Sequence, residues 1–329
     1  MTTGFKENQF RNMSLKDIDV ACRLTDFSRD PPPELLENSI FQIGIIHPIL
    51  LTHPHPLHRV ISGHRRLKVA GKAGHQEIPV RIVDRNVNEE TMLSINLSEN
   101  RSHRQYSDIE KAGILDRLVK AGINESKVIQ DYMPMLALER SKKLFENFLQ
   151  AHTLNESLKQ LLHDTKVPLR HFSAMLDWDR ESQDAVERVF NILRPGINKW
   201  RDLLDLIDDL AKRDRQPPAN ILSQQEIQAM LKGKEAPSPD LYDTVHQFLH
   251  DRRNPFLSGL QKKLVRILDQ LQLAPGTRVR TPENFETEEI KIELGFKNEK
   301  EFSGQVKKLS EAGRSKALTD LIRLFKDLK

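Results

Sequence analysis

Along the first hundred positions, the pattern of hydrophobic and polar residues alternates between the spacing of a helix and that of a strand. Apolar side chains recur at helical spacing, with Gly44 as a C-terminal cap, beside short β-branched and leucine-rich runs typical of strands. A proline-rich turn between the first two runs indicates a hairpin. The predicted order is helix, strand, strand, helix, strand, over residues 34–43, 45–51, 59–62, 64–74 and 78–83. This order predicts an α+β domain.

From residue 89 onward the pattern is almost entirely helical. The predicted helices cover 89–98, 107–121, 125–132, 139–151, 155–163, 168–176, 180–192, 200–213, 255–272, 298–311 and 314–327. Two strands are predicted near the end, over 277–281 and 288–294. We therefore expect three domains: a mixed domain over 1–105, an all-α domain over 106–195, and a mostly helical domain with a small strand pair over 196–329.

Length and composition limit the class of protein. The chain has 329 residues, of which 30% are charged and 38% hydrophobic, as in a folded, helix-rich protein. Cys22 is the single cysteine, which excludes an internal disulfide framework. No apolar run approaches the roughly 18 residues of a membrane span, and the first residues lack a signal-peptide pattern. We expect a cytoplasmic protein without a membrane partner.

The overall charge permits a nucleic-acid partner but does not require one. The formal net charge is +4 and the isoelectric point is about 9.0. Basic and acidic residues are nearly balanced in each predicted domain, and no segment forms a basic tail. Any DNA binding must therefore come from a local surface on a folded element.

A strand that ends at Gly63 and opens directly into a helix is the first candidate site. Free backbone N–H groups at a helix start favour an anion, and the arginines Arg65 and Arg66 add charge-assisted hydrogen bonds. A basic first turn that simply faces solvent is the alternative interpretation.

A second polar cluster follows one helix and precedes another, over residues 98–104. The carboxylate of Glu99 and the amide of Asn100 are suited to a hydrated magnesium ion. His103 and Arg104 are suited to phosphate oxygens. The alternative is an ordinary polar loop. The ligand hypothesis requires this cluster and the Gly63 turn to lie close together around one pocket.

The predicted helix over 141–151 is the candidate DNA reader. Its apolar stripe leaves polar side chains outward that are able to contact phosphates and base edges, and a basic residue starts a later helix. The candidates are Lys142, Lys143, Asn147, Gln150 and Arg170. The alternative is the solvated face of a core helix.

Half of the twelve histidines lie between residues 47 and 75. His53, His55 and His58 share one proline-containing turn, which raises the question of a metal site. No carboxylate is interleaved with them, and exposed loop histidines are common, so we favour an ordinary loop.

Taken in order, these segments resemble a known family. The segments LLENSIFQIGIIHPILL, VISGHRRLKVAGKAGHQEIPVRIV and SENRSHRQYSDIEKAGILDRL look like the N-terminal domain of ParB-type partition proteins, a fold shared with sulfiredoxin. The segment SKKLFENFLQAHTLNESLKQLLHDTKVPLRHFSAML is similar to the family's helix-turn-helix domain. The resemblance covers roughly residues 15–190.

The resemblance implies a CTP site with Mg²⁺ in the N-terminal domain. Glu99 would serve the metal, and together with Asn100 it would serve slow hydrolysis, which leaves the chain a possible CTPase. The implied nucleotide-binding residues are Gly44, Gly63, His64, Arg65, Arg66, Asn100, His103 and Arg104. His64 stands where the family usually has glutamate, and His103 replaces an arginine, which leaves the nucleotide's identity open.

The resemblance also implies partners and a role. A ParB-like protein would bind double-stranded DNA, clamp it in a CTP-dependent way, and act in plasmid or chromosome partition on the nucleoid or plasmid. It would form a homodimer, with a ParA-type Walker ATPase as partner. Two alternatives stay open: an enzyme on the same fold, either nuclease or phosphotransferase, and a transcription or plasmid-copy regulator without nucleotide chemistry. A sulfiredoxin activity is disfavoured because Ser62 stands where its cysteine would be.

Overall fold

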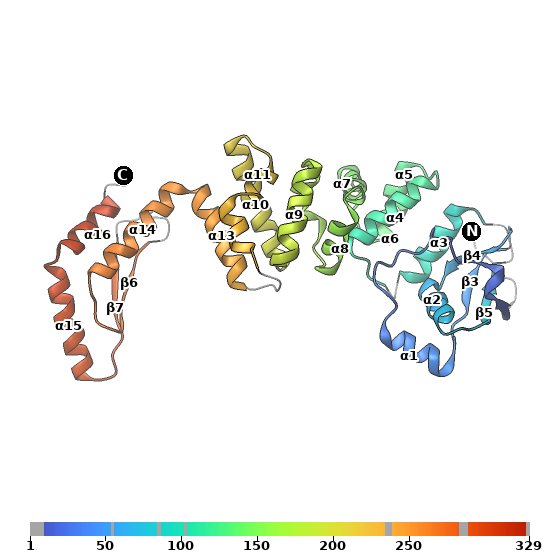
Figure 1. Ribbon diagram of the computed structural model, residues 1–329, viewed down its shortest axis with the longest axis horizontal. Helices are drawn as coiled ribbons and strands as arrows, with labels where there is room; N and C mark the ends of the chain where they lie inside the picture. The colour runs from blue at the N-terminus through green and yellow to red at the C-terminus, as the bar shows by residue number, and fades with distance from the viewer. Residues whose placement is uncertain are drawn as a thin grey trace. The chain divides into compact units, whose positions relative to one another are not determined.

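A computed structural model describes residues 10–53, 56–83, 87–101, 104–233, 239–282 and 289–326 (Figure 1). The chain forms two compact units, residues 1–239 and 240–329. His55 and His103 lie outside the described residues.

The first unit begins with a five-stranded mixed sheet. Its spatial order is β1, β5, β3, β4, β2. The pairs β1 with β5 and β3 with β4 are antiparallel, whereas β3 with β5 and β2 with β4 are parallel. The strands are β1 (Phe10–Ser14), β2 (Ile18–Asp19), β3 (Ile49–Leu51), β4 (His58–Ser62) and β5 (Glu77–Ile82). The predicted hairpin and the last strand are confirmed.

Both faces of this sheet are covered by helices. Strand residues with alternate orientation enter different clusters, since Val60 packs with Leu67 of α2 (His64–Lys72) while Ile61 packs with Met92 of α3 (Glu89–Asn100). Helix α1 (Glu34–Ile43) packs against α2 and ends at Gly44, as predicted. The burial of the consecutive residues Val60 and Ile61 therefore shows that β4 is covered on both sides.

The sequence analysis missed β1 and β2. Most of β1 is exposed, with only Met13 buried, so it lacks the alternation that identifies a half-buried strand. β2 has two residues. Both lie at the edges of the sheet, where pairing with a neighbour, not apolar content, defines a strand.

Helices fill the rest of the first unit. They are α4 (Asp108–Lys120), α5 (Glu125–Lys127), the π-helical η2 (Val128–Tyr132), α6 (Met133–Met135), α7 (Lys142–His152), α8 (Glu156–Asp164), α9 (Arg180–Leu193), α10 (Ile197–Asp214), α11 (Pro218–Leu222) and α12 (Gln225–Leu231). The predicted helix over 168–176 is instead two 3₁₀ segments, η3 (Leu169–His171) and η4 (Ser173–Asp177).

Helices on both sides of residue 195 share one core. α11 packs against both α9 and α10, and α10 contacts η3 and η4. Trp200 of α10 is fully buried, and its ring centroid lies 4.4 Å from that of Phe190 in α9. The expected boundaries at 105 and 195 stay predictions, and the compact units divide at 239.

The second unit has four helices and a strand pair among its described residues. They are α13 (Pro239–Arg253), α14 (Pro255–Gln270), β6 (Thr277–Arg280), β7 (Lys291–Leu294), α15 (Glu299–Gly313) and α16 (Lys316–Lys326). The strands are antiparallel, and α14 packs against α16 around Leu321 and Phe325. This confirms the predicted mostly helical region with a small strand pair. Among the described helices, none combines the length and apolar character needed to cross a membrane.

Candidate functional site

A cleft of about 1870 Å³ lies in the first unit, and both predicted phosphate-site segments line it. Gly63, Arg65 and Arg66 line it from the start of α2, and Glu99 and Asn100 from the end of α3. The expectation that the two segments lie around one pocket is thereby met. Of the other implied nucleotide-binding residues, His64 and Arg104 also line the cleft, whereas Gly44 does not.

Gly63 shapes the start of α2. Its φ of 106° lies in the left-handed region that favours glycine. A Cβ there would lie 3.2 Å from a side-chain carbon of Ile49 and 3.3 Å from the guanidinium of Arg66. The backbone therefore turns sharply from β4 into the helix, and the first N–H groups of α2, which have no acceptor within the helix, become available to a ligand.

His64 does not extend into the cleft as a charged ligand. Its side chain is buried, and its Nε2 lies 2.9 Å from Oγ1 of Thr25. The Thr25 hydroxyl donates to the carbonyl of Val60, so Nε2 of His64 must donate to Thr25. Burial lowers the pKa of His64 to about 4, with Asp26 opposing this and Arg23 and Lys68 adding to it. His64 is therefore neutral at pH 7, and its backbone N–H is the group it can offer.

Arg65 lies on the cleft with an incompletely bonded guanidinium. Its Nη2 is 3.6 Å from Oδ2 of Asp30, which is longer than a hydrogen bond. Its Nε is buried and finds no acceptor among the described residues. The guanidinium therefore keeps hydrogen-bonding capacity that no described residue uses.

Arg66 supports the wall of the cleft. Its Nη1 donates to the carbonyls of His47 and Pro48, the latter at 3.0 Å, and thereby holds the segment that precedes β3. Burial lowers the pKa of Arg66, while the nearby carboxylate of Glu99 raises it. The side chain remains charged and faces Glu99.

Glu99 and Asn100 differ in how far they are already engaged. Asn100 donates from Nδ2 to the carbonyl of Asn96 at 2.8 Å, which caps the end of α3. Asn96 is itself buried and donates to the carbonyl of Ile61. Glu99 is exposed, and its carboxylate oxygens are of the type that Mg²⁺ prefers.

Arg104 is held by an acidic and an aromatic neighbour. Its Nη2 donates to Oε1 of Glu110 at 2.8 Å, and its guanidinium lies 4.6 Å from the ring centroid of Tyr106. Glu110 is also the N3 residue of the capping box that Ser107 starts at α4. Both contacts fix the direction of Arg104.

Part of the cleft is lined by groups that were not predicted from the sequence. Glu90 of α3 accepts from Nζ of Lys127 at 2.6 Å and from the hydroxyl of Tyr132 at 3.2 Å. Burial, with Glu90 adding to it, raises the pKa of Tyr132 to about 12. All three residues line the cleft, so η2 and its neighbours form one of its walls. Nothing in the local sequence indicates this contact.

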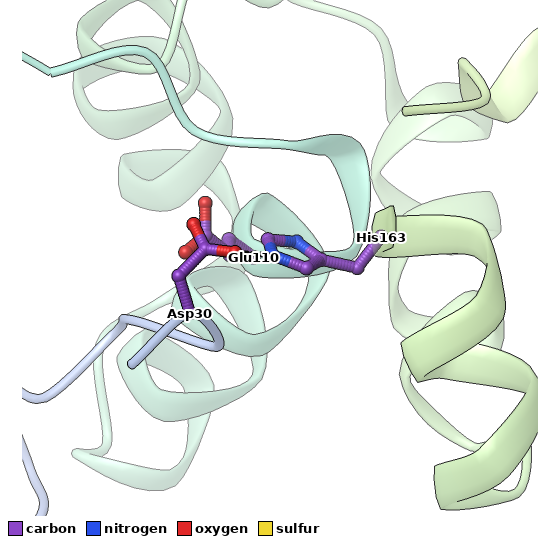
Figure 2. A group of neighbouring side chains, drawn as sticks. All are labelled: Asp30, Glu110 and His163. Atoms are coloured by element: carbon purple, nitrogen blue, oxygen red, sulfur yellow. Dashed lines mark hydrogen bonds and ion pairs between the residues drawn. The ribbon is translucent and has the colours of Figure 1, made fainter. Parts of the chain in front are cut away.

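Asp30, Glu110 and His163 form a cluster (Figure 2). They come from the segment before α1, from α4 and from α8, and their potential ligand atoms lie within 4.8 Å of one another. Both carboxylates already face arginines, since Arg65 approaches Asp30 and Arg104 binds Glu110. These cations disfavour a divalent metal ion, and we interpret the cluster as a hydrogen-bonded junction.

In the histidine-rich turn, the structure describes His53 and His58, and His55 lies outside the described residues. His58 is buried, and its Nδ1 lies 2.6 Å from the carbonyl of Thr52, while His53 is exposed.

The candidate DNA residues lie mainly on the exposed face of α7. Lys142 and Lys143 are exposed, and Lys142 is 3.4 Å from Glu125. Asn147 is half-buried. Gln150 donates to the carbonyl of Leu176 at 2.7 Å, so its amide is engaged by η4.

Arg170 lies apart from α7, on the short segment η3, where its side chain is exposed. The structure therefore groups Lys142, Lys143 and Asn147 on one helix and leaves Arg170 on another element.

Comparisons with known proteins match the N-terminal part of the chain. Residues 2–101 match the family model of the ParB N-terminal domain. A probable chromosome-partitioning protein ParB of Coxiella burnetii is 32% identical over 143 residues, which cover 44% of this chain and 47% of that protein. Stage 0 sporulation protein J of Bacillus subtilis is 27% identical over 141 residues, or 43% of this chain and 48% of that protein. The chain spans about half the length of these relatives.

Two solved structures are also similar. The C-terminally truncated ParB of Caulobacter crescentus complexed with CTP-gamma-S has a TM-score of 0.25 and 19% identity, covering 55% of this chain and 98% of that chain. A Pnob8-like ParB-N domain has a TM-score of 0.34 and 18% identity, covering 73% of this chain and 99% of that chain. At these scores neither structure bears on the assignment of the site.

Proposed function

Because the chain carries a ParB N-terminal domain, we propose that its cleft binds CTP with Mg²⁺. The first N–H groups of α2, together with Arg65 and Arg104, bind the phosphates, and Arg66 braces the wall beside them. Glu99 holds the metal ion or its water ligands, and Asn100 completes this end of the site. The observation that carries the proposal is that one cleft is lined by both the Gly63 turn and the Glu99–Asn100 pair.

The residues present fit a polyphosphate and its metal ion. The buried Nε of Arg65 finds no acceptor among the described residues. A Cβ at position 63 would crowd Ile49 and the guanidinium of Arg66, so glycine leaves room at the start of α2. The exposed carboxylate of Glu99 is a suitable oxygen ligand for Mg²⁺. Bound Mg²⁺ would neutralise phosphate charge and thereby assist slow hydrolysis.

The middle helices supply the DNA contact in this proposal. Lys142, Lys143 and Asn147 on the exposed face of α7 contact double-stranded DNA. Arg170 adds a contact to the phosphate backbone of the DNA. Gln150 is a weaker candidate because its amide already binds Leu176. The protein then acts as a ParB-like partition protein that clamps DNA in a CTP-dependent way, with a ParA-type ATPase as its partner.

Self-association through the second unit is part of the same proposal. Large apolar side chains of that unit are exposed, including Phe256 at 68%, Val265 at 57% and Phe296 at 52%. Sedimentation of the full chain should give a dimer, and a chain ending after residue 238 should give a monomer. A dimer of the shortened chain would contradict this assignment.

The nucleotide assignment is tested by isothermal titration calorimetry of the full chain with CTP, ATP and GTP in Mg²⁺. Of the three nucleotides, only CTP is expected to show saturable binding. Arg65→Ala should weaken CTP binding by at least about ten-fold, because a charge-assisted contact to phosphate is lost. Titrations with and without a DNA palindrome test the coupling. No binding of any nucleotide would leave only a DNA-binding adaptor.

A further inference from the structure

Arg65 has an acidic neighbour that a bound polyphosphate would have to replace. We propose that Asp30 is an internal counter-anion of the site, which neutralises Arg65 in the empty cleft and lowers the affinity for CTP. This inference rests on the proposed function of the cleft. It makes Asp30, which does not itself line the cleft, a residue that sets the affinity.

The position of Asp30 is set from α8. His163 is buried, and its Nε2 lies 2.9 Å from Oδ1 of Asp30 (Figure 2). The carboxylate can only accept, so Nε2 donates to it, while Nδ1 lies 2.8 Å from the Ser107 hydroxyl. The hydrogen bond from His163 is the main cause that lowers the pKa of Asp30, with burial opposing it and Arg65 and Arg104 adding to it. Asp30 is therefore ionised at neutral pH.

The contact between Asp30 and Arg65 is suited to exchange. Their closest charged atoms are 3.6 Å apart, and the Asp30 side chain is 58% exposed, so water can solvate it when Arg65 is taken by a ligand. His163 remains as a partner of Asp30 after such an exchange. A triphosphate offers several anionic oxygens to the guanidinium, whereas Asp30 offers one carboxylate at long range.

Glu110 differs from Asp30 in this respect. It is buried, it binds Arg104 at 2.8 Å, and it accepts from the backbone N–H groups of Arg29 and Ser107. Its loss would leave several donors unsatisfied, so it holds Arg104 in place and is not the displaceable anion. Arg65 and Arg104 thus have different carboxylate partners, since that of Arg104 is fixed and that of Arg65 is exchangeable.

The test is the affinity of Asp30→Asn for CTP and for inorganic tripolyphosphate, measured by titration calorimetry on the full chain. Removal of the counter-anion should tighten binding of both ligands by up to about five-fold, the range of one exposed ion pair. Glu37→Gln is the matched control, because it removes one negative charge from a residue that pairs with Lys72 away from the cleft, and it should leave both affinities unchanged.

A double-substitution cycle separates this inference from the proposed function. The gain from Asp30→Asn should vanish in an Arg65→Ala background, because the two residues act on each other. If Arg65→Ala weakens binding but Asp30→Asn leaves it unchanged or weakens it, Asp30 is not a competitor and the inference is overturned while the CTP site stands. If the unmodified chain binds neither ligand, both proposals fail. Thermal unfolding of each variant verifies that it is folded.

Discussion

The cleft and the exposed face of α7 are both candidates for binding phosphates, yet they are built in opposite ways. The cleft combines segments far apart in the chain, and its groups are fixed by a left-handed glycine and by partly buried hydrogen bonds. The face of α7 comes from one helix, and its ion pair between Lys142 and Glu125 is exposed.

This difference determines how each region should respond to substitution. Exposed ion pairs contribute little to stability, so side chains on α7 are free to change partners. Groups in the cleft are positioned before a ligand arrives. Changes in the cleft should therefore alter stability and binding together, whereas changes at the exposed lysines of α7 should reduce DNA affinity in small steps and leave stability unchanged.

The largest expected combined effect on stability and binding is that of Gly63→Ala. The positive φ and the close approach of Ile49 should destabilise the first unit by about 2 kcal/mol and abolish CTP binding. Gly71→Ala in the same helix is the control, since a Cβ there meets open space and alanine favours a helix. Thermal unfolding and calorimetry measure both properties. Equal melting temperatures for the two variants would contradict the role of Gly63.

Acidification should weaken the region around His64. The pKa of its buried imidazole is about 4, against roughly 6.5 for an unfolded histidine. The unfolded state therefore binds more protons between these values, so the stability contribution is complete above about pH 6.5 and falls as the pH drops toward 4. The loss is on the order of 2–3 kcal/mol.

Hydrogen exchange of the β4 and α2 amides, measured between pH 7 and pH 4.5 and corrected for intrinsic rates, follows this change. His64→Gln keeps a donor for Thr25 but does not titrate, so its protection should depend less on pH. If the unmodified chain and the His64→Gln variant showed the same pH dependence of protection, the loss of stability on acidification would come from other groups.

A smaller effect is expected for Gln150→Ala. The side chain lies on α7, but its amide donates to Leu176, so the loss of this bond should cost about 1 kcal/mol of stability. DNA affinity should be unchanged. Urea unfolding measures the stability, and fluorescence anisotropy with a palindromic duplex measures the DNA affinity. Reduced DNA affinity with unchanged stability would indicate that Gln150 contacts DNA.

The smallest effect is expected for Lys143→Ala. Its side chain is exposed, so stability should not change, while DNA affinity should fall a few-fold. The slope of log affinity against log salt should decrease by about one, as for the loss of one phosphate contact. Lys72→Ala, on α2, removes the same charge from a residue outside the candidate surface and serves as the control.

Much of the fold was predictable because its causes are local. Helix α1 ends at Gly44, Ser107 starts a capping box, and the apolar residues at the centres of β4 and β5 are buried, all of which follow from the pattern of the chain. The prediction of a single helix over 168–176 was wrong, because the apolar spacing of this segment fits two 3₁₀ turns that pack against α10. Edge strands were missed because their pairing leaves no local signal.

The turn at Gly63 and the residue types around it could be predicted from the chain, since backbone conformation and side-chain chemistry are properties of neighbouring residues. The folded structure was needed to place Glu99 near enough to Arg66 to raise its pKa, to make His64 neutral, and to bring Asp30 to His163, which is 133 residues away along the chain. Contacts of this kind depend on the path of the whole chain, and the burial that shifts a pKa exists only once that path is complete.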